Sequence, residues 1–117
     1  MKLKSIKHKF GAHKCQRGEI KFSSKLERSV HDLLTSLKES GKLLFFLSQV
    51  PIRIGGGHKY LLDFMVFTPT DCYFFFVLGR GIDLPLGKLK RHQAEEILGV
   101  EIHVVTDSVQ VFGVISQ

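Results

Sequence analysis

Hydrophobic residues recur along the chain with two different periods, which predict helices in some segments and strands in others. Over residues 25–40 the apolar positions are spaced by three or four, as on one face of a helix. These positions are Leu26, Val30, Leu33, Leu34 and Leu37. Ser24 and Glu27 have the spacing of a capping box at the start of this helix, and Gly41 supplies a stop at its end.

The next segments have the short, continuous apolar character of strands. Residues 43–50 form one such run, which Pro51 is expected to end or bend, and residues 60–67 form another. The three glycines at 55–57 lie between them, so we expect a β-hairpin. A third run at residues 73–78 is rich in aromatic side chains and is typical of a central strand.

The remaining chain predicts a second helix followed by one or two strands. Residues 86–98 carry apolar side chains on one side and charged ones around the rest, and Gly99 follows. Residues 101–105 alternate as a strand, and residues 109–115 are expected to add an edge strand. We therefore expect an α/β fold with a mixed central β-sheet flanked by two helices, including a parallel strand–helix–strand unit.

The net charge of +6 has an uneven distribution along the chain. Residues 1–18 contain six basic residues and no acid: Lys2, Lys4, Lys7, Lys9, Lys14 and Arg17. Since 17 Lys and Arg less these six leaves 11, the rest of the chain balances its 11 Asp and Glu. We interpret residues 1–18 as a basic arm that contacts nucleic-acid phosphates, and residues 19–117 as one α/β domain. A solvated tail is the alternative for the arm.

Composition also limits the cellular setting. The sequence has two cysteines, Cys15 and Cys72, so no disulfide framework is expected. No stretch approaches the roughly 20 apolar residues of a membrane span, and no apolar segment follows the basic residues after Met1. We expect a cytoplasmic protein without membrane contact.

Two acidic residues are candidates for metal-dependent chemistry. Cleavage of a phosphodiester by a metal ion needs carboxylates that converge on the cation. Asp63 is a lone acid inside the apolar run 61–67, where an unpaired carboxylate is costly. Glu27 is the other candidate, although capping its helix would also explain it.

These residues belong to a series of short motifs that resembles the PD-(D/E)XK nuclease superfamily, in particular small phage-associated endonuclease-like proteins. The matching pieces are Ser24-Lys-Leu-Glu27, Leu62-Asp63-Phe64, Leu78-Gly79-Arg80-Gly81, Lys88-Leu-Lys-Arg91 and Gly99-Val-Glu-Ile102. The resemblance implies a restriction-endonuclease-like core and a Mg²⁺-dependent endonuclease acting on structured or duplex DNA. It also implies that Glu27 and Asp63 bind the metal. Because many relatives dimerise, a homodimer is a further expectation. A phage-encoded protein would act in the host cytoplasm.

The motif departs from the family pattern at two catalytic positions. Leu78 occupies the position of the second metal carboxylate, and Arg80 occupies that of the lysine. A milder change places Leu62 where the family has proline. Arg80 is expected to bind phosphate or, alternatively, to pair with Asp63 in place of a cation. The missing carboxylate is expected from another position: Asp83, Glu95 or Glu96.

The sequence therefore leaves three functional hypotheses open. The protein is an active nuclease with a relocated carboxylate, an inactive nuclease-fold module that binds DNA, or a phage protein that binds a host or defence factor. Under the first two hypotheses, three basic residues of the second helix are expected to contact phosphates alongside the arm. These are Lys88, Lys90 and Arg91.

Overall fold

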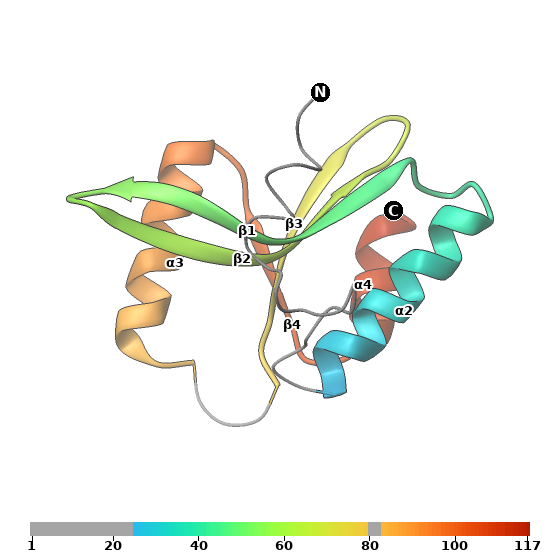
Figure 1. The fold of residues 1–117 in the computed structure, drawn as a ribbon, viewed down its shortest axis with the longest axis horizontal. Helices are drawn as coiled ribbons and strands as arrows, with labels where there is room; N and C mark the ends of the chain where they lie inside the picture. The colour runs from blue at the N-terminus through green and yellow to red at the C-terminus, as the bar shows by residue number, and fades with distance from the viewer. Residues whose placement is uncertain (1–24, 80–82) are drawn as a thin grey trace, which may run out of the picture.

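The computed structural model describes residues 25–79 and 83–117, and Figure 1 shows how their helices and strands are arranged. The described elements are, in chain order, α2 (Lys25–Glu39), β1 (Phe45–Gly55), β2 (His58–Phe67), β3 (Cys72–Val77), α3 (Pro85–Leu98), β4 (Ile102–Val105) and α4 (Ser108–Ile115). The expected α/β class with a mixed sheet is confirmed.

Helix α2 forms where the apolar periodicity predicts it. Its buried positions are Glu27, Val30, Leu34 and Leu37, which are spaced by three or four and therefore share one face. A carboxylate thus occupies the first position of the core-facing stripe, one turn before Val30.

Strands β1 and β2 form the expected hairpin. The turn between them uses Gly55, Gly56 and Gly57, all with positive φ angles, which glycine adopts without a steric penalty. Strand β1 continues through Pro51, which pairs with Leu61, so of the two expectations for Pro51 the ending of the strand is not observed. A proline fits here because β1 is an edge strand and needs no amide donor on its open side.

The sheet has the order β1-β2-β3-β4 and is mixed. Its first three strands pair antiparallel, whereas β3 and β4 pair in parallel. Parallel neighbours need a crossover connection, and α3 supplies it. Gly99 ends α3 in the left-handed conformation, with its N–H donated to the carbonyl of Glu95.

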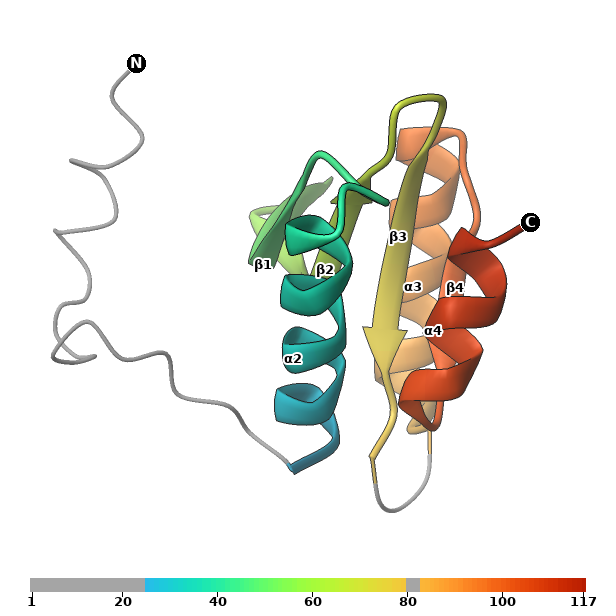
Figure 2. The same ribbon diagram turned by 90° about the vertical axis from the view of Figure 1, so that its right-hand side faces the viewer.

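Helices cover the sheet on both faces. Figure 2 shows α2 and α4 side by side along one face, with α3 behind the sheet on the other. Each face has its own core: Val30, Leu34, Phe64 and Phe75 belong to the α2–α4 side. Residues such as Tyr60, Leu62 and Ala94 form the core beneath α3.

Helix α4 replaces the edge strand expected at residues 109–115. Asp107 caps this helix by accepting a hydrogen bond from the amide of Gln110 at 3.0 Å. Gln110 in turn accepts one from the amide of Thr106 at 2.8 Å. Val111 is buried on the α2 side of the sheet, and Val114 and Ile115 pack against that core. The described part of the chain therefore has three helices around its sheet rather than two.

Halfway along the hairpin, the side chains of β2 change from the core under α3 to the core under α2. In β2, Leu62 contributes to the core under α3, but Phe64, two residues later, contributes to the core under α2. A regular strand would place both on the same face. The change occurs at Asp63, and all three residues are buried.

No helix within residues 25–79 and 83–117 is long and apolar enough to cross a membrane.

Candidate functional site

Glu27 lies in the first turn of α2 and is only 3% exposed. Figure 2 shows this turn at the same end of the molecule as the C-terminal end of β3. An ionised side chain at such a depth is costly unless a partner compensates its charge. Capping a helix does not require burial, so its position indicates a role in addition to capping.

Asp63 comes from the middle of β2 and is 8% exposed. Its Oδ2 accepts a hydrogen bond of 2.7 Å from the backbone amide of Val77, at the end of β3. This bond ties Asp63 to the neighbouring strand at the point where β3 ends. The fixed Oδ2 leaves the other carboxyl oxygen for a second partner.

The structure brings the two acids together, and they share a hydrogen bond. The pKa of Asp63 is raised to about 8, mainly by burial and further by the hydrogen bond and negative charge of Glu27. The amide of Val77 acts in the opposite direction. Two adjacent carboxylates cannot both ionise without strong repulsion, so the pair holds a proton near neutral pH. A divalent cation would replace that proton with a charge that both groups favour.

A third polar side chain, Gln49 of β1, reaches the same pair. Its Nε2 donates to Oε2 of Glu27 at 3.4 Å, and hydrogen bonding by the same side chain lowers the pKa of Asp63. Gln49 was not among the residues expected from the sequence. The available signal is its place as a polar residue at the end of the apolar run 43–50, and this signal does not distinguish it from an ordinary exposed strand residue.

Asp83, expected as a relocated metal ligand, has a different partner in the structure. Both of its carboxylate oxygens accept hydrogen bonds from Arg91, at 3.0 and 2.8 Å. Hydrogen bonding to Arg91 lowers the pKa of Asp83, and the same interaction raises the pKa of Arg91. Arg91 is 5% exposed and lies over the ring of Phe76, so its guanidinium is enclosed within the fold. The expected contact of Arg91 with a DNA phosphate stays a prediction.

The other acids of α3 also lie away from Glu27 and Asp63. Glu95 accepts a hydrogen bond of 2.8 Å from the amide of Ile102, which joins α3 to the start of β4. Glu96 is exposed on the same helix, which packs on the opposite face of the sheet from α2. Among residues 25–79 and 83–117, no group of three or more His, Cys, Asp or Glu side chains is placed to hold a metal ion.

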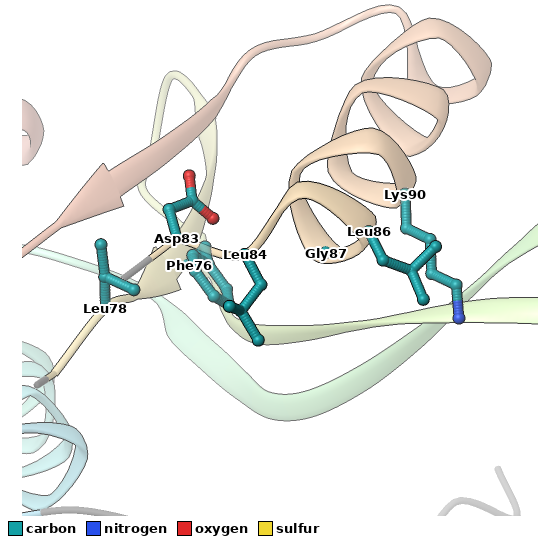
Figure 3. A pocket seen from close by; sticks show the side chains of 7 residues that line it. All are labelled: Phe76, Leu78, Asp83, Leu84, Leu86, Gly87 and Lys90. Atoms are coloured by element: carbon teal, nitrogen blue, oxygen red, sulfur yellow. The ribbon is translucent and has the colours of Figure 1, made fainter. Parts of the chain in front are cut away.

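Leu78 occupies the position expected for the second metal carboxylate. Its amide bonds the carbonyl of Val105, and its side chain lines an open cavity of about 330 Å³ at the start of α3. Figure 3 shows this cavity with the side chains that line it: Phe76, Leu78, Asp83, Leu84, Leu86, Gly87 and Lys90. The lining is mostly apolar, and Asp83 within it is already paired with Arg91. Hence the cavity offers no free carboxylate to a cation.

Some of the remaining predicted site residues lie in the described part of the chain and others lie outside it. Lys88 is exposed and Lys90 is half-buried on α3, so both amino groups can reach solvent. Arg80, Ser24 and the arm of residues 1–18 lie outside the described residues. Their expected roles therefore stay predictions.

Comparison with known proteins gives no independent assignment. No protein-family model, no curated protein and no solved structure matches this chain. The geometry around Glu27 and Asp63 is therefore the feature that points to a function.

Proposed function

We propose that this chain is a DNA-processing protein of the PD-(D/E)XK nuclease type, which acts as a metal-dependent endonuclease on structured or duplex DNA. The observation that carries the proposal is the buried pair of Glu27 and Asp63, brought together from α2 and β2 and sharing a hydrogen bond. A buried acid pair costs stability, and a binding role for a cation accounts for its presence.

The arrangement of elements supports the same proposal. A helix, an antiparallel hairpin, a third strand and a parallel return through α3 follow the order expected for a restriction-endonuclease-like core. The paired acids lie where α2 begins and β3 ends. In the proposed fold this end of the sheet receives the DNA.

The residues present fit a magnesium ion bound through few protein ligands. Mg²⁺ commonly keeps several waters and takes one or two carboxylates together with substrate phosphates. Glu27 and Asp63 would hold it, and the amide of Val77 fixes Oδ2 of Asp63. When bound, the cation would polarise the scissile phosphate and lower the pKa of a bound water. Arg80 is expected to stabilise the phosphate charge.

The proposal is tested by incubating labelled duplex and branched DNA with the protein and Mg²⁺ or Mn²⁺. Wild-type protein should cleave, and Asp63→Asn or Glu27→Gln should reduce the rate by about a hundredfold or more. Glu39→Gln is the matched control because Glu39 is exposed at the other end of α2. Absence of cleavage by wild type, or undiminished cleavage by Asp63→Asn, contradicts the endonuclease proposal.

A DNA-binding module without cleavage is the second candidate. The specific observation in its favour is Leu78, which places an apolar side chain where the family motif has a carboxylate. Under this alternative, wild type binds DNA without cutting it, and binding is unchanged by Asp63→Asn. Measuring DNA affinity and cleavage on the same samples separates the two candidates.

A further inference from the structure

Gln49 has a backbone conformation that its residue type rarely adopts. Among the described residues it is the one non-glycine position with positive φ, at 55°. The Cβ atom makes this left-handed region costly for most residues, whereas glycine enters it freely. The chain uses glycine for this purpose at the nearby hairpin turn. A glutamine at the strained position therefore indicates that its side chain offsets the cost.

The hairpin register places Gln49 directly opposite Asp63. Ser48 pairs with Phe64 and Val50 pairs with Leu62, so Gln49 and Asp63 occupy the matching positions between these two pairs. The hairpin changes its core-facing side at this same position. The unusual conformation of Gln49 is thus located where the strand must turn Asp63 toward α2.

The amide of Gln49 is suited to two neighbouring acids. Carboxylate oxygens only accept hydrogen bonds, whereas the side-chain NH₂ of glutamine carries two donors and no charge. Nε2 reaches Glu27 at 3.4 Å, and hydrogen bonding by the Gln49 side chain lowers the pKa of Asp63. Gln49 is itself exposed, whereas Glu27 and Asp63 are buried. It can stabilise both carboxylates without competing with a cation for their negative charge.

We infer that Gln49 is a positioning residue, which holds the carboxyl groups of Glu27 and Asp63 in the geometry that binds one divalent cation. This inference rests on the proposed function. It adds a third element, β1, to the site, and it assigns a role to a residue outside the acidic motif. Hydrogen-bond partners of metal ligands commonly change metal affinity by about 10–100-fold.

The test is Mn²⁺ binding to the full chain by isothermal titration calorimetry, for wild type, Gln49→Gly and Gln49→Asn. Glycine and asparagine both tolerate positive φ, but neither side chain reaches the acids as glutamine does. We expect about 10-fold or greater loss of Mn²⁺ affinity in both variants, with folded-state stability unchanged or increased. Gln93→Asn, at an exposed position of α3, should bind Mn²⁺ as wild type does.

A second measurement examines the contacts of Gln49 without metal. In proton–nitrogen NMR spectra, Glu27→Gln and Asp63→Asn should shift the side-chain amide signals of Gln49 and leave those of Gln93 in place. A merely structural role of Gln49 in β1 would change stability but would not couple its amide signals to both acids.

The outcomes separate this inference from the proposed function. If wild type binds Mn²⁺ and both Gln49 variants bind it equally well, the positioning role is overturned and the metal site remains. The positioning role is also overturned if neither acid substitution shifts the side-chain amide signals of Gln49. If wild type binds no Mn²⁺, the proposed metal-dependent function fails, and the role of Gln49 fails with it.

Discussion

Asp63 is the middle one of three consecutive buried residues. A regular strand with one buried face does not produce this pattern. Leu62 and Phe64 are both 0% exposed and belong to different cores, while Asp63 between them is 8% exposed. In an ordinary strand the middle residue would point away from the other two. The local twist of the hairpin therefore gives the acid a buried position that two-residue alternation cannot encode.

This burial predicts an unusual dependence of stability on pH. The folded pKa of Asp63 is about 8, whereas an unfolded aspartate titrates near about 4. Between these values the folded state binds more protons than the unfolded state. The free energy of unfolding should therefore decrease as pH rises from about 4 to 8 and then level off.

Chemical denaturation across this pH range measures the effect, with Asp63→Asn as the comparison. The variant keeps the size of the side chain and removes its titration, so its stability should change less between pH 4 and 8. Equal slopes for wild type and variant would contradict the assignment of this pH dependence to Asp63.

The ion pair between Asp83 and Arg91 predicts an asymmetric response to substitution. The side chain of Arg91 is 6% exposed and that of Asp83 is 23% exposed. Removing Asp83 leaves an enclosed cation without its partner, whereas removing Arg91 leaves an acid that solvent can reach. Asp83→Asn should therefore lower the urea midpoint more than Arg91→Met does. The opposite order would show that packing of Arg91 on Phe76 outweighs its charge.

Asp63 could be identified from the sequence but Gln49 could not, for a physical reason. A lone acid in an apolar run is conspicuous because its burial is costly. The role of Gln49 depends on a φ angle and a cross-strand register, and neither can be predicted from the residue type. Arg91 resembled a surface cation because its enclosure depends on Asp83, eight positions earlier, folding back onto the helix.

At the scale of elements, the local patterns were sufficient wherever one period dominated. The spacing of Val30 and Leu34 defined α2, and the three-glycine turn defined the hairpin. The parallel pairing of β3 and β4 followed from the helix between them. Residues 108–115 were ambiguous because Val109 and Val111 alternate as in a strand, while Val111, Val114 and Ile115 also have helical spacing.

The N-cap residue Asp107 favours the helix α4 over a strand for this segment. Its contribution to stability can be predicted. Asp107→Ala removes the side chain that accepts from the amide of Gln110 and should destabilise the protein by about 1 kcal/mol. Gly113→Ala should act oppositely and stabilise it by about 0.5–1 kcal/mol, since an added Cβ meets no atom within 4 Å.

Thermal or urea unfolding of both variants provides the measurement. A strand at residues 108–115 would respond differently, because neither a cap nor helix propensity would contribute. Stabilisation by Asp107→Ala, or destabilisation by Gly113→Ala, would therefore contradict the helical assignment of this segment.

At the scale of the whole molecule, the positive charge is distributed unevenly. The excess positive charge belongs to residues 1–18, while the rest of the chain is balanced. The α/β domain contributes Lys88 and Lys90 from α3, but Arg91 is committed to Asp83. If the protein binds DNA as proposed, we expect most of its phosphate neutralisation to come from the arm, because the rest of the chain has no excess positive charge.

The arm therefore should determine the salt dependence of DNA binding. Each neutralised phosphate on duplex DNA adds about 0.9 to the slope of log affinity against log salt, so six cations contribute up to about five. Replacing the six Lys and Arg of residues 1–18 with Gln should reduce the slope by several units and weaken binding more than tenfold at low salt. Lys38→Gln with Lys42→Gln, at exposed positions where α2 ends, controls for loss of charge elsewhere.

Fluorescence anisotropy with labelled duplex DNA at several salt concentrations measures both quantities. Because the arm would supply affinity and Glu27 and Asp63 would supply chemistry, the arm variant should still cleave DNA at saturating protein concentration and low salt. An unchanged slope would exclude residues 1–18 as the main phosphate contact. The excess charge of the arm would then have no part in DNA binding, and contacts would have to come from the balanced domain itself.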